Sequence, residues 1–169
     1  MENYINKTET YPTERSKIEI MAPAGSWESL AAAIKAGADS VYFGIGKLNM
    51  RSKSSSNFSV DDLKKIVEIC TENNVKSYLT VNTILYDNDL ISMREIIETA
   101  KEAGISAIIA SDVAAMMYAN SLNVEVHLST QLNISNIEAL KFYAQFADVV
   151  VLARELNLKQ VSEIFSAIQ

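Results

Sequence analysis

Residues 59–82 read SVDDLKKIVEICTENNVKSYLTVN, a helix signal followed by a strand signal. In the first part, four apolar residues follow the spacing i, i+3, i+4 and i+7 of one helix face: Leu63, Ile66, Val67 and Cys70. Ser59, with Asp62 three residues later, resembles a capping box at the start of that helix. The last part, 76–82, is a short apolar run typical of a strand. The segment therefore predicts one helix leading into one strand.

The same alternation continues in both directions along the chain. Strands are predicted at 18–22, 40–44, 76–82, 107–111, 124–129 and 148–153. Helices are predicted at 26–36, 59–73, 88–103, 112–121, 134–146 and 157–168. Gly37 and Gly104 follow the first and third helices, where a left-handed residue often ends a helix. Strict alternation of this kind predicts a parallel sheet with helical crossovers.

The two sides of the predicted strands distinguish a barrel from an open sheet. In 76–82, one side is mostly apolar and the other carries Tyr78, Thr80 and Asn82. An open doubly wound sheet is covered on both faces and favours apolar residues on both, whereas the inner face of a barrel tolerates polar groups. We predict an α/β fold, an incomplete TIM-type barrel with six β/α units, rather than a flavodoxin-like sheet. It spans 17–169 and follows a polar, flexible lead at 1–16.

Composition limits the classes of function. The chain has 169 residues and a formal charge of −6, so nucleic acid would need a local basic patch to bind. One cysteine is present, which excludes an internal disulfide and a four-thiolate site made by this chain alone. No metal site is predicted. The sequence has no membrane-spanning apolar run and no signal peptide, and we expect a cytoplasmic protein.

Polar residues follow the predicted strands, where ligands bind in both architectures. Asn82, Gln131 and Arg154 are poor choices for helix caps, and we predict that they bind substrate. Asn133 and Glu155 lie beside two of them. The same residue types also serve as caps and turns, which is the interpretation we favour for Ser111 and Asp112.

A histidine and a basic loop complete the candidates. His127 is the only histidine, and its place on the strand points it into the barrel, either as a general base or as a hydrogen-bonded structural residue. The connection 45–58 contains Lys47, Arg51 and Lys53 and no acidic residue. These three cations are phosphate-binding candidates, with a solvated basic loop as the alternative.

Four segments together resemble the amino-terminal part of peptidase family U32, the collagenase-like proteases: IEIMAPAGSWESLAAAIKAGADSVYFGIGKLNMRS, SYLTVNT, HLSTQLNISN and VVLARELN. Within the family, the chain is most similar to the branch that helps to form 5-hydroxyuridine at the tRNA wobble position. The resemblance implies a TIM-type barrel whose mouth is surrounded by the matching residues Pro23, Gly25, Asn49, Arg51, Asn82, Gln131, Asn133, Arg154 and Glu155. The substrate-binding candidates among them are Asn49, Arg51, Asn82, Gln131, Asn133 and Arg154. His127 and Glu155 are candidates for catalysis, but the sequence assigns neither of them a step in a reaction.

The resemblance also implies cofactors and partners. Full-length relatives hold an iron–sulfur cluster on cysteines that follow the sixth unit, and this chain ends at Gln169, so we expect a fragment or a truncated gene with no cofactor of its own. We expect tRNA or a small anionic co-substrate as the partner. We do not expect the chain to bind a membrane. Two alternatives stay open: a collagenase-like peptidase, and a non-catalytic assembly domain that forms homo-oligomers through its open sheet edges.

Overall fold

One parallel sheet organises the structure, a computed structural model that describes residues 18–50 and 58–167. Its strands are β1 (Met21–Pro23), β2 (Ser40–Gly44), β3 (Lys76–Val81), β4 (Ala107–Ala110), β5 (Val126–Leu128) and β6 (Val149–Val150). They lie side by side in chain order, and each neighbouring pair is parallel.

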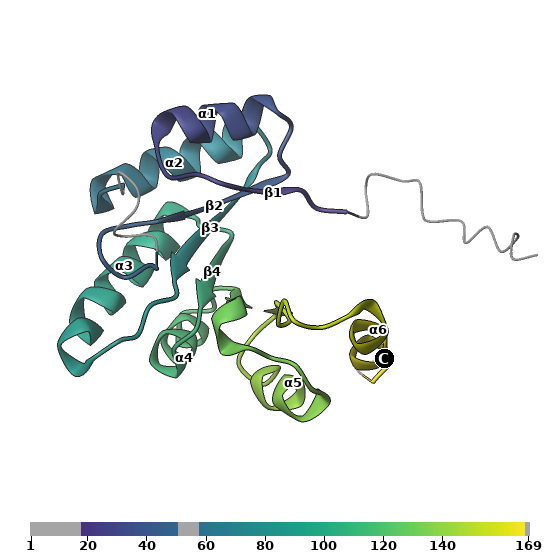
Figure 1. Cartoon of the computed structure of the whole chain (residues 1–169). Coiled ribbons are helices and arrows are strands. Elements are labelled where there is room, and N and C mark those ends of the chain that lie inside the picture. The colour runs from purple at the N-terminus through teal and green to yellow at the C-terminus, as the bar shows by residue number, and fades with distance from the viewer. Residues whose placement is uncertain (1–17, 51–57, 168–169) are drawn as a thin grey trace, which may run out of the picture.

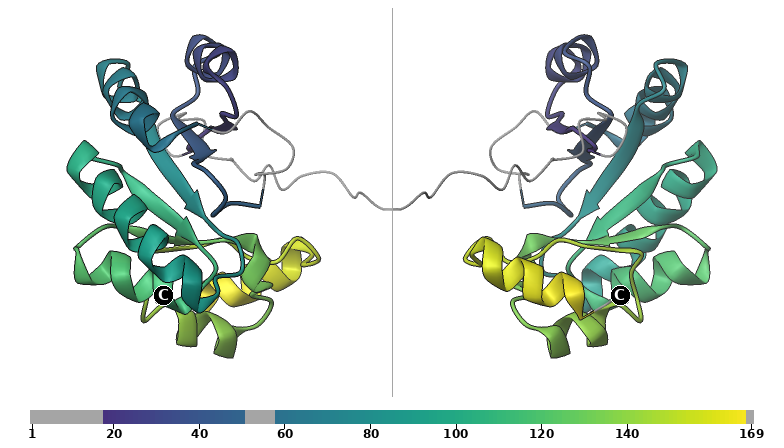
Figure 2. Two further views of the ribbon diagram at one scale, coloured as in Figure 1. Left: turned by 90° about the vertical axis from the view of Figure 1, so that its left-hand side faces the viewer. Right: turned by 90° about the vertical axis from the view of Figure 1, so that its right-hand side faces the viewer.

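Helices cover the convex side of this sheet and leave the other side open (Figures 1 and 2). They are α1 (Trp27–Lys35), α2 (Val60–Glu72), α3 (Leu90–Ala103), α4 (Val113–Ser121), α5 (Ile137–Tyr143) and α6 (Leu158–Ser166). Two 3-10 helices, η2 (Asp87–Asp89) and η3 (Thr130–Leu132), follow β3 and β5.

The strand order confirms the predicted barrel type. A doubly wound sheet reverses its order at a switch point, whereas a barrel adds each strand to the same edge. The order β1-β2-β3-β4-β5-β6 has no reversal. Six strands with helices on one side therefore form a half-barrel with a concave inner face.

Some of the predicted helix ends are confirmed, namely the start of α2, the glycines after α1 and α3, and the cap of α4. Ser59 and Asp62 form the capping box of α2, and the Ser59 amide donates to Asp62 Oδ2 at 2.8 Å. Gly37 and Gly104 have φ values of 81° and 83°, a conformation that costs glycine little because it has no Cβ. Asp112 caps α4, because its Oδ1 accepts from the Ala114 amide at 2.8 Å.

Several elements are shorter than the sequence predicted, and side chains explain why. β1 begins at Met21 rather than Ile18 because the Ile20 amide donates to Asp39 Oδ2 at 2.8 Å. β6 begins after Asp148, whose Oδ2 accepts from the Val126 amide at 2.9 Å. It ends early because the Ala153 amide turns to the carbonyl of Ile134 at 2.9 Å.

Two further elements are shorter than predicted, and two short helices were not predicted. The predicted strand 124–129 is reduced to β5, and the predicted helix 134–146 to α5, which begins at the cap Asn136. The sequence also did not predict η2 and η3, because short 3-10 turns have no periodic apolar signal.

The core lies between the sheet and its helices. The apolar side of β3 faces outward, with Leu79 and Val81 fully buried, and the predicted stripe of α2 is buried against the same layer. Polar members of the strands consequently face the concave side. The predicted lead, 1–16, lies outside the described residues. Among the described helices, none has the length and apolar character needed to cross a membrane.

Candidate functional site at the barrel rim

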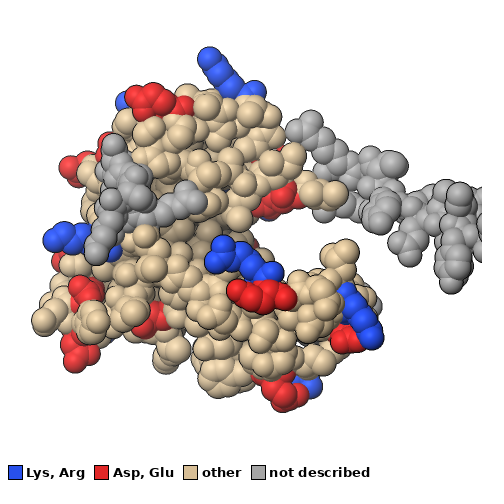
Figure 3. Space-filling view, viewed as in Figure 1, with Lys and Arg blue, Asp and Glu red and all other residues tan. Residues whose placement is uncertain are grey.

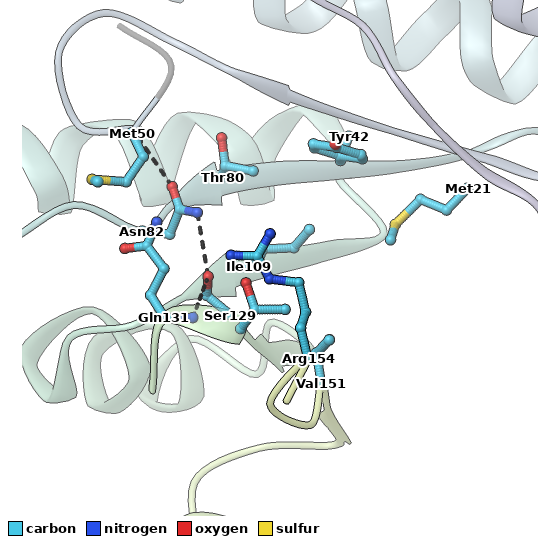
Figure 4. A pocket seen from close by; sticks show the side chains of 11 residues that line it. Met21, Tyr42, Met50, Thr80, Asn82, Ile109, Ser129, Gln131, Val151 and Arg154 are labelled. Atoms are coloured by element: carbon cyan, nitrogen blue, oxygen red, sulfur yellow. Dashed lines mark hydrogen bonds between the residues drawn. The ribbon is translucent and has the colours of Figure 1, made fainter. Parts of the chain in front are cut away.

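A pocket of about 380 Å³ lies on the concave face at the carboxyl ends of the strands (Figure 4). We call it the rim pocket. Its lining combines amides, hydroxyls, one guanidinium and apolar side chains: Met21, Tyr42, Met50, Thr80, Asn82, Ile109, Ser129, Thr130, Gln131, Val151 and Arg154. Three predicted substrate-binding residues, Asn82, Gln131 and Arg154, are thus brought together although they follow three different strands.

Asn82 joins two loops across the rim pocket. Its Oδ1 accepts from the Met50 amide at 3.3 Å, and its Nδ2 donates to Ser129 Oγ at 3.3 Å. Ser129 Oγ also accepts from the Gln131 amide at 3.4 Å. These contacts connect the loop after β2 with η3 through the end of β3.

The side chains of Gln131 and Arg154 differ from that of Asn82 in their contacts. Both residues are exposed, and neither side chain makes a hydrogen bond or ion pair with another residue of the described segments. Figure 4 shows the Gln131 side chain extending toward Asn82 and the Arg154 side chain extending toward the centre of the pocket. A guanidinium in such a place suits a phosphate or a carboxylate.

Asn49 has a different environment from the one predicted. It is buried, and its Nδ2 donates to the carbonyl oxygen of Gly46 at 3.2 Å. A Cβ on Gly44 would lie 2.2 Å from Asn49 Cγ, so glycine at position 44 makes room for this side chain. Asn49 therefore fixes the turn before Met50 and is absent from the pocket wall.

Other predicted site residues lie outside the rim pocket. Asn133 ends η3 in a left-handed conformation with φ 50°. Glu155 is exposed in the turn after β6, and Lys47 is exposed in the loop after β2. Arg51 and Lys53 fall outside the described residues. Figure 3 shows a hollow on this face with a basic side chain, in blue, at its edge.

A second polar group lies at the opposite, amino-terminal end of the concave face. We call it the lower cluster: Glu19, Lys76, Tyr78, Glu125 and His127. Glu19 accepts from Lys76 Nζ at 2.7 Å and from the Tyr78 hydroxyl at 2.6 Å. Burial acts to raise the pKa of Glu19, but the hydrogen bonds from Lys76 and Tyr78 outweigh it and lower the pKa to about 2. Burial and the bond to Glu19 raise the pKa of Tyr78.

His127 belongs to this lower cluster and not to the pocket wall. Its Nε2 lies 2.7 Å from Glu125 Oε1, and its ring centre lies 4.7 Å from that of Tyr78. It faces the inside of the barrel, as predicted. Its contacts are those of the hydrogen-bonded structural histidine, while a role as general base stays a prediction.

Several residues of the rim pocket were not predicted from the sequence. Tyr42 and Thr80 lie inside strands, on the same inner face as Asn82, and Thr80 Oγ1 donates to the carbonyl of Phe43 at 2.9 Å. The alternation of sides along β3 placed Thr80 on the same side as Asn82, but Thr80 was not predicted as a site residue because it lies inside the strand and not after it. Met21 and Val151 carry no such polar signal.

An iron–sulfur cluster does not fit the residues present. Cys70 is the only thiol of the chain, lies fully buried on α2, and has a pKa raised to about 11 by burial. A protonated, enclosed thiol is a poor metal ligand. Within residues 18–50 and 58–167, no group of three or more His, Cys, Asp or Glu side chains is arranged to hold a metal ion.

Comparisons with known proteins identify the family of the chain and agree with its fold. The family model described as Peptidase family U32 matches residues 25–169. The collagenase of Porphyromonas gingivalis is 70% identical over 150 residues, covering 89% of this chain and 36% of that protein. tRNA hydroxylation protein P1 of Bacillus subtilis is 32% identical over 151 residues, covering 88% of this chain and 36% of that protein.

A solved structure supports the architecture alone. The structure of the U32 peptidase Mk0906 has a TM-score of 0.74 with 12% sequence identity, and the match covers 89% of this chain and 65% of that one. In length, the chain spans about a third of the Porphyromonas gingivalis collagenase and of tRNA hydroxylation protein P1, 36% in each case.

Proposed function

Because the chain belongs to peptidase family U32, we propose that it forms the substrate-binding half-barrel of a tRNA-hydroxylation member, with the rim pocket receiving the wobble uridine. The proposed partner is tRNA, and the proposed location of the protein is the cytoplasm. A relative that carries hydroxylation in its name, tRNA hydroxylation protein P1, matches 88% of the chain.

The lining of the rim pocket is the observation that carries this proposal. A nucleotide combines a flat apolar ring, an edge of hydrogen-bond donors and acceptors, and an anionic phosphate. The pocket offers the Tyr42 ring, the Gln131 amide and the Arg154 guanidinium to these three parts. Unpaired bases in RNA are recognised in this way, by stacking and by edge hydrogen bonds.

Lys47, Arg51 and Lys53 extend the proposed phosphate contacts along the loop after β2. These three cations are close together in the sequence, and the proposal uses them as phosphate-binding candidates because the chain has a net charge of −6. An iron–sulfur cluster, implied for full-length relatives, would require ligands other than the buried Cys70.

Mass spectrometry of tRNA tests the proposal in cells. Deleting the gene that encodes this chain is expected to remove 5-hydroxyuridine from the wobble position, and the wild-type gene is expected to restore it. A gene with Arg154→Ala should restore it poorly, whereas Arg94→Ala, on α3 away from the rim, should restore it fully. An unchanged 5-hydroxyuridine level in the deletion strain would refute the proposal.

A collagenase-like peptidase is the second candidate, because the relative with 70% identity is named Collagenase. The purified protein is incubated with gelatin and with denatured collagen, each with and without added divalent metal. Cleavage that disappears with Arg154→Ala would favour this candidate over RNA binding. Intact substrates under all conditions would remove it.

Assembly through the sheet edges is the third candidate. β1 and β6 each have one neighbour in the described sheet, and parallel strands with a free edge are able to pair with another chain. Light scattering coupled to size-exclusion chromatography measures the mass in solution. A mass of one chain at all concentrations would exclude homo-oligomers.

A further inference from the structure

We infer that the two amides of the rim pocket have separate tasks: Asn82 positions the rim, and Gln131 recognises the hydrogen-bonding edge of the bound pyrimidine. This inference rests on the proposed function, because it assigns roles within the same pocket. Asn82 and Gln131 are the two side-chain amides in the described lining.

Asn82 has both ends of its amide engaged with the protein. Its oxygen accepts from the Met50 backbone and its nitrogen donates to Ser129 Oγ. The partners lie 32 and 47 residues away in the chain, so Asn82 joins segments that are distant in the sequence. These contacts use one oxygen lone pair and one N–H of the amide, and together they hold it in one orientation between the two loops. Asn82 is therefore a positioning residue.

Gln131 has the opposite arrangement. Its backbone amide is held by Ser129 Oγ, which fixes the start of the side chain, while its side-chain amide contacts no hydrogen-bonding partner in the described segments. An amide presents a carbonyl acceptor and an N–H donor side by side. Uracil presents N3–H and the O4 carbonyl side by side, so that the two groups form a complementary pair.

The rest of the lining restricts where the base can lie. The hydroxyl proton of Thr80 is donated to the carbonyl of Phe43, so this residue has only acceptor capacity left for a ligand. Tyr42, Met21 and Met50 supply apolar surface for the flat faces of a ring. Arg154 supplies positive charge on another side of the cavity (Figure 4). Of the two amides in the described lining, Gln131 is the one whose donor and acceptor are both without a hydrogen-bonding partner in the described segments.

RNA binding with a modified base tests the recognition role. The probes are two anticodon stem-loops, one with uridine and one with 3-methyluridine at the wobble position, because the methyl group removes N3–H. Fluorescence anisotropy of the full chain should show about tenfold weaker binding of 3-methyluridine, a typical cost of one lost base contact. Gln131→Ala should bind both probes equally, and the matched control Gln145→Ala, exposed at the end of α5, should discriminate as wild type does.

Asn82→Ala separates the positioning role from the recognition role. It should weaken both RNA probes by a similar factor and keep the preference for uridine. Hydrogen exchange of the Met50 amide gives a readout without RNA: Asn82→Ala should accelerate it at least tenfold, and Gln131→Ala should leave it unchanged. Asn82→Asp should restore slow exchange, because a carboxylate still accepts from Met50 and the Ser129 hydroxyl is able to donate to it.

The outcomes distinguish the two levels of the proposal. Wild-type protein that binds neither stem-loop would refute the proposed function, and the recognition role with it. Wild-type binding with discrimination retained in Gln131→Ala would refute the recognition role alone. Met50 exchange that is unaffected by Asn82→Ala would refute the positioning role, whatever the RNA data show.

Discussion

At the lower end of the concave face, Glu19 is bound by Lys76 and Tyr78, and His127 is bound by Glu125. At the rim, Asn82 is bound on both sides, but the side chains of Gln131 and Arg154 make no such contact in the described segments. Both ends are polar, and they differ in whether the polar groups are satisfied by the protein itself. In TIM-type barrels, the amino-terminal end of the strands serves stability and the carboxyl-terminal end serves ligands.

The largest effect is expected at the lower cluster. Tyr78→Ala removes a buried ring that contacts His127 and a hydroxyl that binds Glu19, so we expect a loss of about 3–5 kcal/mol in the free energy of unfolding. Tyr78→Phe keeps the ring and should lose about 1–2 kcal/mol. Urea unfolding followed by circular dichroism measures both. Equal losses in the two variants would contradict the role given to the ring.

A substitution at the rim should have little effect on stability and a larger effect on RNA binding. Arg154→Ala should change the free energy of unfolding by less than about 0.5 kcal/mol, because the residue is exposed and its side chain makes no hydrogen bond or ion pair with the described residues. The affinity for a tRNA anticodon stem-loop should fall about tenfold. The slope of log affinity against log salt concentration should shrink by about 0.7 for one lost phosphate contact.

Anisotropy titrations at several salt concentrations measure these two quantities. A strong loss of stability in Arg154→Ala, with an unchanged salt slope, would reverse the comparison between the two ends.

The next effect concerns acid stability. The pKa of Glu19 is about 2 in the folded protein against 4.5 for the free side chain. A lowered pKa means that folding favours the charged form, so this contribution is complete above pH 4.5 and disappears as the pH falls toward 2. Glu19→Gln should lower stability at neutral pH by about 1 kcal/mol, since the carboxylate is partly exposed.

Urea unfolding at a series of pH values measures that dependence. The difference between wild type and Glu19→Gln should shrink steadily on acidification through this range. A difference that stays constant down to pH 2 would show that Glu19 makes no charge-dependent contribution.

The smallest effect is expected for a rim residue with a structural role. Asn133 has φ 50°, and Asn133→Gly should alter stability by less than about 0.5 kcal/mol, because glycine adopts this conformation readily. Asn133→Ala should cost about 1 kcal/mol. Neither variant should change RNA affinity at matched stability. A specific loss of RNA binding in Asn133→Gly would show that the side chain itself contacts substrate.

Local patterns predicted the fold well because each β/α unit carries its own signal. The stripe of α2, the capping box at Ser59 and the alternation of β3 are all readable over a few residues. Element ends were predicted less well, because they depend on partners such as Asp39 and Asp148 that bind strand amides from other segments.

The candidate site was only partly predictable for the same reason. The positions of Asn82, Gln131 and Arg154 after strands predicted that they share one rim. What the sequence could not show is that Asn82 is engaged by distant partners, or that Asn49 is enclosed beside Gly44. Those facts depend on how loops pack after the strands have come together.

The close fit between Gly44 and Asn49 constrains how homologous sequences vary. A side chain at position 44 would occupy the space of the Asn49 amide, 2.2 Å from its Cγ. The two positions should therefore be replaced jointly in divergent homologues, with any larger residue at 44 accompanied by a smaller one at 49. A correlated pair of this kind would mark, from alignments alone, the members whose β2 loop adopts another path.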